Sequence, residues 1–257
     1  MNVTTRQDGL LRGKVILVVG ASTGIGASAA RLFASEGAAV ALLARSADRV
    51  QDVAEEINGA GHRAIALVGD VSVGGDVAQA VDETVARFGR LDGAFNNAAM
   101  GQKGRLEDVT EDDFDRIMGV NVKGVWLCLR EELRVMRAAG SGAIVNVSSI
   151  GGYRGSPGFG AYQATKHAVL GLTRTAAHDA GPDGIRVNAI APGPVLTEMI
   201  LTPDGDIPDP VRARISATPL RRAAQPEDVA ETAAWLLSDR AAHVSGVTLP
   251  VDGGLTA

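Results

Sequence analysis

The chain has 257 residues, of which 46% are apolar and 21% charged, and its formal net charge is −5. A chain of this length and apolar content can bury one large core, and its mixed charge does not predict a nucleic-acid partner. The single cysteine, Cys128, excludes an intramolecular disulfide and fits a reducing compartment. Residues 1–13 are polar and lack the apolar core of a signal peptide, and no apolar run approaches the roughly 18 residues that span a bilayer. We therefore expect a cytoplasmic protein with no membrane partner.

Short apolar runs alternate with amphipathic stretches of helical spacing along the whole chain. Strands are expected at residues 14–19, 39–44, 63–68, 91–95, 143–147, 186–190 and 247–251. Helices are expected between these runs, including a long one at 110–139 that opens with a capping box at Thr110. Continuous apolar runs are typical of strands that are covered on both faces. The order predicts an α/β fold: one Rossmann-like domain over residues 1–257, with a doubly wound, mostly parallel seven-stranded sheet and helices on both faces.

The first strand is followed by a glycine-rich turn that opens a helix. The turn contains Gly20, Ser22, Thr23, Gly24, Ile25 and Gly26. Without side chains, the backbone amides and the helix N-terminus can approach a pyrophosphate closely. An isolated glycine string can be no more than a tight turn, but between a strand and a helix it predicts a dinucleotide site. Asn97 and Ala98, at the end of the fourth strand, should lie beside the same cofactor.

The residues that follow the second and third strands concern the adenosine half of the cofactor. An acid after the second strand would bind the ribose hydroxyls of NAD, but here Arg45 and Ser46 stand at that place. An arginine can form a charge-assisted bond to a 2′-phosphate, so NADP is predicted over NAD. The alternative is a solvated surface arginine. Asp70, followed by Val71, can accept a hydrogen bond from adenine or simply cap a turn.

Three polar residues follow the fifth strand. Tyr162 and Lys166 are four residues apart and would share one face of a helix, and Ser149 lies on the loop that leads into it. A phenol, an ammonium and a hydroxyl that converge at the end of a buried strand predict proton-transfer chemistry. Because a free phenol has a pKa of about 10, the ammonium and a cationic nicotinamide are expected to lower it. A packed phenol, a solvated lysine and a helix-entry serine are the alternative.

These motifs, in their order along the chain, carry a family resemblance. They are Gly20-x-x-x-Gly24-x-Gly26, Asp70-Val71, Asn96-Asn97-Ala98, Asn121, Ser149, Tyr162-x-x-x-Lys166, Pro192-Gly193 and Val251-Asp252-Gly253-Gly254. Over essentially its whole length the chain resembles the short-chain dehydrogenase/reductase family. Val19 replaces the threonine usual before the first glycine, and Ala99 replaces the glycine that usually follows Asn-Asn-Ala. Both departures lie on the cofactor side.

The resemblance implies an oxidoreductase that interconverts a ketone and a secondary alcohol by hydride transfer with NADP. Tyr162 would be the general acid or base, Lys166 would also bind the nicotinamide ribose, and Ser149 would hold the substrate oxygen. Asn121 would position a water that links Lys166 to solvent, although a core amide bonded to backbone is the alternative. By the same resemblance, residues that follow the sixth strand would contact the cofactor: Pro192, Gly193, Val195 and Thr197.

Residues 196–222 form a long segment without an obvious element, which makes them a candidate lid over the substrate. Met199 is expected to face an apolar substrate, and the acidic residues Asp204, Asp206 and Asp209 favour a free small molecule over an acyl carrier protein. Small residues on the helix that bears Tyr162, such as Gly171, predict a homodimer or homotetramer. His62, His178 and His243 are spread out with no carboxylate or cysteine at ligand spacing, so no metal site is expected.

Two other classes of function stay open at this stage. An isomerase or lyase could use the same scaffold and a bound nicotinamide without net redox change. A binding module without catalysis is the other alternative, and the intact set of Ser149, Tyr162, Lys166 and Asn121 argues against it.

Overall fold

The computed structural model describes residues 9–202 and 204–257, so residues 1–8 of the expected domain and residue 203 of the expected lid lie outside it. The strands form one sheet in the order β3-β2-β1-β4-β5-β6-β7. Their bounds are Val15–Val19 (β1), Ala39–Ala44 (β2), Arg63–Val68 (β3), Gly93–Asn96 (β4), Gly142–Val147 (β5), Ile185–Pro192 (β6) and Thr248–Val251 (β7). The predicted seven-stranded α/β sheet is confirmed. Every neighbouring pair of strands is parallel, whereas a mostly parallel sheet was predicted.

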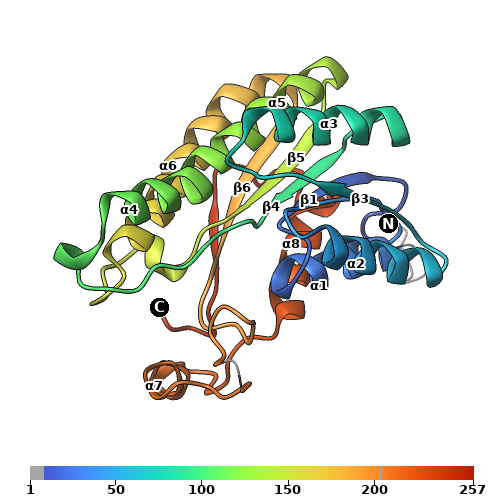
Figure 1. Ribbon diagram of the computed structural model, residues 1–257. Coiled ribbons are helices and arrows are strands. Elements are labelled where there is room, and N and C mark those ends of the chain that lie inside the picture. Colours follow the sequence, from blue (N-terminus) through green and yellow to red (C-terminus); the bar gives the residue numbers. More distant parts are fainter. Residues whose placement is uncertain (1–8, 203) are drawn as a thin grey trace.

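Helices cover both faces of the sheet (Figure 1). One layer contains α1 (Gly24–Ser35), α2 (Ala47–Gly59) and α8 (Pro226–Leu237). The other contains α3 (Gly74–Phe88), α4 (Glu111–Met118), α5 (Gly124–Ala139) and α6 (Gly160–Ala180). None of the described helices is both long and apolar enough to cross a membrane.

Strand β1 shows why the apolar runs are continuous. Ile16 and Val18 pack into the core under α1, α2 and α8, whereas Leu17 and Val19 pack into the core under α3, α5 and α6. All five residues of β1 are buried because both faces are covered. The strand order reverses between β1 and β4, and a crevice opens at the carboxyl ends of the strands at such a point.

The long helix expected at residues 110–139 is confirmed at its ends but differs in the middle. Thr110 Oγ1 accepts a hydrogen bond from the Asp113 amide at 3.1 Å, as expected for the cap. Between α4 and α5 the chain makes a π turn, Gly119–Lys123, which contains Asn121. The apolar spacing did not reveal it because one extra residue shifts the pattern by less than a turn.

The expectation of an irregular segment at 196–222 is wrong in part, because residues Asp209–Ala217 form α7. No residue of α7 is buried, so the helix has no apolar stripe by which its sequence could be recognised. Asp209 in its first turn and Arg214 in its last turn suit the helix dipole. The helix stands apart from the two helical layers (Figure 1).

Candidate active site

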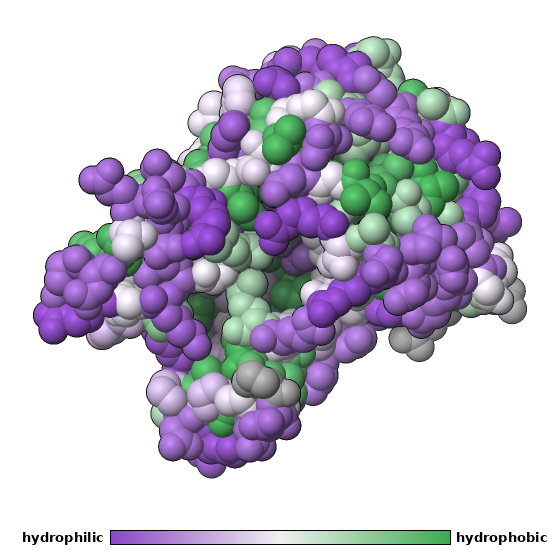
Figure 2. Space-filling view, viewed as in Figure 1, coloured by the Kyte–Doolittle hydropathy of each residue, from purple (hydrophilic) through white to green (hydrophobic). Residues whose placement is uncertain are grey.

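A cavity of about 390 Å³ lies at the carboxyl ends of β1, β2, β3 and β4. This face of the molecule is hollowed near its middle (Figure 2). Twelve residues predicted for the cofactor line the cavity: Gly20, Ser22, Thr23, Gly24, Ile25, Arg45, Ser46, Asp70, Val71, Asn97, Ala98 and Thr197. The structure thus brings together residues from five separate stretches of the chain.

The glycine turn has the backbone features that an anion site needs. Gly20 has a φ of 81°, and a Cβ there would lie 2.7 Å from the Ala98 backbone. Thr23, the N-cap of α1, makes no side-chain hydrogen bond to the helix, and the first turn holds no acid. The helix amides therefore stay available, and the helix dipole favours a negative group at this end. These residues fit the pyrophosphate of a dinucleotide.

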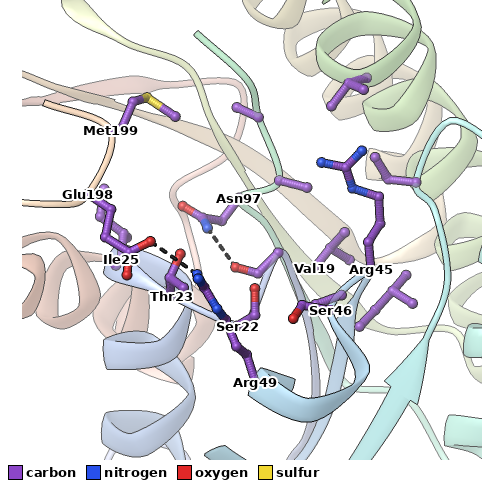
Figure 3. Close-up of a pocket in the computed structure, with 18 of the residues that line it drawn as sticks. Val19, Ser22, Thr23, Ile25, Arg45, Ser46, Arg49, Asn97, Glu198 and Met199 are labelled. Atoms are coloured by element: carbon purple, nitrogen blue, oxygen red, sulfur yellow. Dashed lines mark hydrogen bonds and ion pairs between the residues drawn. The ribbon is translucent and has the colours of Figure 1, made fainter. Parts of the chain in front are cut away.

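Gly26 does not line the cavity and serves packing instead. A Cβ at this position would lie 2.0 Å from the Gly20 carbonyl oxygen. The same oxygen accepts a hydrogen bond from Asn97 Nδ2 at 3.1 Å, which ties the turn to the end of β4 (Figure 3). Gly26 therefore lets α1 begin directly beneath the turn.

Asp70 caps a turn, which was one of the two roles predicted for it. Its Oδ1 accepts hydrogen bonds from Ser72 N at 2.8 Å and Ser72 Oγ at 2.7 Å, and its Oδ2 lies 3.8 Å from Arg45 Nη1. Burial raises the pKa of Asp70, but the Ser72 bonds and the Arg45 charge outweigh it and hold this pKa below its ordinary value. The carboxylate is thus ionised beside Arg45.

Two charged residues of the cavity were missed by the sequence analysis. Arg49 on α2 and Glu198 after β6 both line it, and Arg49 Nη1 lies 3.2 Å from Glu198 Oε2 (Figure 3). Arg49 lies four residues after Arg45, in the first turn of α2, which was a usable signal. The pairing joins positions 149 residues apart and has no signature in sequence. Met199 lines this cavity as well, although a place beside the substrate was expected.

Ser149, Tyr162 and Lys166 converge at the end of β5. Ser149 begins a 3₁₀ turn at Ile150–Gly152, where its Oγ accepts from the Gly151 amide at 3.0 Å. Lys166 Nζ donates to the Val147 carbonyl at 2.9 Å and lies 5.7 Å from the centroid of the Tyr162 ring. Tyr162 is also hydrogen-bonded to Ser149. The three groups therefore form one cluster.

Burial dominates the electrostatics of this cluster. Burial raises the pKa of Tyr162, and the hydrogen bond with Ser149 only partly opposes it. Burial also lowers the pKa of Lys166, to about 8. Both groups are displaced toward their neutral forms because the low-dielectric interior disfavours charge. The lysine alone does not lower the tyrosine pKa, and the phenol is protonated at neutral pH.

Asn121 has all its side-chain polar atoms engaged within the protein. Its Oδ1 accepts from the Met100 amide at 2.9 Å, and its Nδ2 donates to the Met100 carbonyl at 3.0 Å and to Thr165 Oγ1 at 3.1 Å. These contacts match the core-amide alternative. Met100 follows Ala99, which lines the cavity, and Thr165 precedes Lys166 on α6. Through these hydrogen bonds Asn121 connects the end of the cavity to α6.

The remaining predicted residues lie outside the cavity lining. Tyr162 and Lys166 belong to the adjacent cluster on α6. Pro192 ends β6, and the Gly193 amide donates to the Val251 carbonyl at 3.0 Å. Val195 is buried and pairs with Ala224. Gly193 and Val195 thus fix the path of the chain that delivers Thr197 to the cavity.

Comparison with known proteins identifies close relatives. A family model described as Enoyl-(Acyl carrier protein) reductase matches residues 20–256. The A-factor type gamma-butyrolactone 1′-reductase (1S-forming) of Streptomyces virginiae is 48% identical over 255 residues, covering 98% of this chain and 99% of that one. The cis-4-hydroxycyclohexanecarboxylate dehydrogenase of Sinomonas cyclohexanicum is 44% identical over 246 residues, with 95% and 97% covered.

Solved structures agree with these relatives. The crystal structure of a dehydrogenase/reductase from Sinorhizobium meliloti 1021 matches with a TM-score of 0.87 at 36% identity and covers 96% of each chain. The chain belongs to the short-chain dehydrogenase/reductase family of oxidoreductases.

Proposed function

We propose that the chain is an NADP-dependent oxidoreductase that interconverts a ketone and a secondary alcohol, with Tyr162 as general acid in reduction and general base in oxidation. The observation that carries the proposal is the contact of Tyr162 with Ser149 beside the buried Lys166 ammonium. Asn121 bonds to Thr165, which precedes Lys166 in this cluster. It also bonds to Met100, which follows Ala99 of the cavity that contains the glycine turn.

A bound nicotinamide supplies the hydride in reduction and accepts it in oxidation. Ser149 donates a hydrogen bond to the substrate oxygen, and Tyr162 transfers its hydroxyl proton to that oxygen as the alcohol forms. Burial keeps Tyr162 protonated, which suits it to act as the acid. In oxidation the phenolate form needs the charge of Lys166. The Asn121 side chain is already bonded to Met100 and Thr165, so it would support this cluster through Thr165 instead of holding a water.

The preference for NADP rests on the charges at the adenosine end of the cavity. Arg45, Ser46 and Arg49 line this end, and the residues directly after β2 include no acid. Two guanidinium groups can bind a 2′-phosphate, whereas the ribose hydroxyls of NAD gain less from them. NAD binding is expected to be weaker rather than absent.

We infer a compact ring-bearing substrate from the relatives. The names of the two relatives described above contain a butyrolactone and a hydroxycyclohexane, and neither is named as an isomerase or lyase. In this chain α7 reaches the start of α6, where Arg214 lies 5.2 Å from the centroid of the Phe159 ring. A lid in this place would enclose a small substrate above Tyr162.

The proposal includes a homodimer or homotetramer in the cytoplasm. Trp126 on α5 is 46% exposed, and a Cβ added at Gly171 on α6 would meet no atom within 4 Å. These features suit close packing of a second copy against α5 and α6. Sedimentation that shows a monomer at micromolar concentration would contradict the oligomer.

The decisive experiment measures NADPH consumption against a panel of cyclic and linear ketones. Tyr162→Phe should lower kcat by about 10²- to 10⁴-fold, because it removes the acid without changing the ring. Tyr153→Phe is the matched control, since its hydroxyl donates to the Thr248 carbonyl at 3.2 Å and faces β7. Turnover by Tyr162→Phe at the unmodified rate would refute the mechanism.

A further inference from the structure

A buried chain of hydrogen bonds runs beneath the candidate active site. Asn96 Nδ2 donates to Glu132 Oε2 at 3.0 Å and to Asn146 Oδ1 at 2.9 Å. Asn146 Nδ2 donates to Thr173 Oγ1 at 3.0 Å. All four side chains are buried, and Glu132 is 0% exposed. The chain therefore crosses α5, β4, β5 and α6 in turn.

Strands β4 and β5 each lead directly to part of the site, and α6 carries Tyr162 and Lys166. Asn97 follows Asn96 on β4 and holds the Gly20 carbonyl. Val147 follows Asn146 on β5, and its carbonyl accepts from Lys166 Nζ. The hydrogen bond between Asn96 and Asn146 thus fixes the glycine turn relative to the catalytic lysine, and Glu132 fixes Asn96.

The network contains more buried hydrogen-bond acceptors than donors. Asn96 Oδ1 and Glu132 Oε1 are both enclosed and have no hydrogen-bond partner among the described residues. Both are acceptors, and both amide hydrogens of Asn96 are already used by Glu132 and Asn146. A proton on Glu132 supplies the missing donor, whereas an ionised Glu132 would add further acceptor capacity.

The surroundings of Glu132 also favour the neutral acid. Burial raises its pKa to about 8, opposed only by the bond from Asn96, and no charged group of the described chain contributes. Cys128, one turn earlier on α5, is the neighbouring titratable group, and burial raises the pKa of its thiol well above the ordinary value. Both groups are therefore uncharged at neutral pH.

We propose that Glu132 is a positioning residue of the active site, which as a neutral carboxylic acid holds Asn96 and Asn146 and so sets the spacing between the glycine turn and Lys166. This inference deepens the proposed function and rests on it for its kinetic consequences. It assigns to a residue far from the reacting atoms a role that acts through β4 and β5.

Three variants test the proposal. Glu132→Gln keeps the shape, the neutrality and an N–H donor, whereas Glu132→Leu removes the hydrogen bonds. Glu131→Gln is the matched control, because this neighbouring glutamate pairs with Arg130 and Arg134 instead of the network. At pH 7 we expect kcat to be nearly unchanged in Glu132→Gln and to fall about tenfold or more in Glu132→Leu, because a small misplacement of reacting groups is costly. The KM values and the NADP affinity should change far less than kcat.

The pH dependence separates positioning from general stability. The ratio of kcat for the unmodified enzyme to that of Glu132→Gln should be constant below pH 7 and fall by half at about pH 8, as Glu132 ionises. Lys166 titrates in both proteins and cancels from the ratio. Glu131→Gln should give a ratio that is flat throughout.

An infrared difference spectrum against Glu132→Gln should show a carboxylic-acid C=O band at pH 7. A carboxylate band there, a flat kcat ratio, or full kcat in folded Glu132→Leu would each overturn the proposal. If Glu132→Leu does not fold, the kcat ratio and the infrared band decide the matter. If none of the proteins reduces a ketone with NADPH, the proposed function fails, while the infrared band still tests the protonation of Glu132.

Discussion

Arg49 and Glu198 form an ion pair, 3.2 Å between Nη1 and Oε2, that joins the first turn of α2 to the segment after β6 across the cofactor cavity (Figure 3). Their side chains are 58% and 71% exposed, and pairs of this kind stabilise by at most about 1 kcal/mol. The pair can therefore be exchanged for a stronger partner. A 2′-phosphate bound beside Arg45 would compete with Glu198 for the Arg49 guanidinium.

The first prediction concerns this competition. Glu198→Gln should tighten NADP⁺ binding by about twofold to fivefold, because Arg49 is then free for the phosphate, and should leave NAD⁺ binding unchanged. Arg49→Gln should weaken NADP⁺ binding and abolish the effect of Glu198→Gln. Calorimetric titration of both nucleotides measures these affinities. Arg31→Gln is the control, since Arg31 pairs with Glu56 on α2 and does not line the cavity. An equal change for NAD⁺ would show that the 2′-phosphate is not involved.

The second prediction concerns the hydrogen bond between Ser149 and Tyr162. This bond lowers the pKa of Tyr162 against the effect of burial, so Ser149→Ala should raise that pKa further. Alcohol oxidation needs the phenolate, and the acidic limb of its kcat/KM profile should therefore move to higher pH. At neutral pH we expect a loss of about 10²-fold or more. Ser149→Thr keeps a hydroxyl and should recover part of the rate. An unshifted limb in Ser149→Ala would rule out this role for Ser149.

The third prediction concerns the start of α1. In Gly26→Ala the new Cβ would meet the Gly20 carbonyl oxygen, so either the turn or the helix must move. We expect a loss of unfolding free energy of about 1–3 kcal/mol and a loss of nucleotide affinity, both measurable by denaturation and titration. Gly59→Ala is the control: a Cβ in this last residue of α2 meets no atom within 4 Å. It should stabilise by up to about 1 kcal/mol. A Gly26→Ala protein as stable as this control would contradict the packing argument.

Much of the fold and of the site could be predicted because the signals are local. Each strand is a short apolar run buried on both faces, as in β1, and Tyr162 and Lys166 share a helical face by spacing alone. The helix α7 could not be predicted because none of its residues is fully buried. The π turn at Asn121 leaves no mark in the spacing of apolar residues.

The charges of the site were harder to predict than its residues. The direction in which the pKa of Tyr162 is shifted depends on its burial, and no local sequence pattern indicates how completely a phenol is enclosed. The raised pKa of Glu132 could not be predicted for the same reason, because in the sequence Glu132 looks like an ordinary polar helix residue beside Glu131. The choice of NADP stays a prediction from Arg45, now accompanied by Arg49.

The fourth prediction links Glu132 to stability. The folded protein keeps the Glu132 proton up to about pH 8, whereas the unfolded chain releases it near the ordinary value of 4.5. Between these values the folded state binds more protons at Glu132, so the contribution of Glu132 to the unfolding free energy should fall as pH rises and level off above about pH 8. The slope approaches about 1.4 kcal/mol per pH unit. Urea denaturation from pH 5 to 8 should show this slope in the difference between the unfolding free energies of the unmodified protein and Glu132→Gln. Parallel curves for the two proteins would mean that Glu132 ionises normally.

The π turn at Gly119–Lys123 sets the rotational phase of the helix pair that it joins. Ile117 and Val125 are both buried, 0% and 4% exposed, yet they are eight positions apart. At about 100° per residue, a regular helix would place them about 80° apart around the axis. The wide turn absorbs one residue and restores both to the core side. Deleting Val120 would therefore convert the wide turn into a regular helical one, in which Ile117 and Val125 are seven positions and about 20° apart and both still face the core.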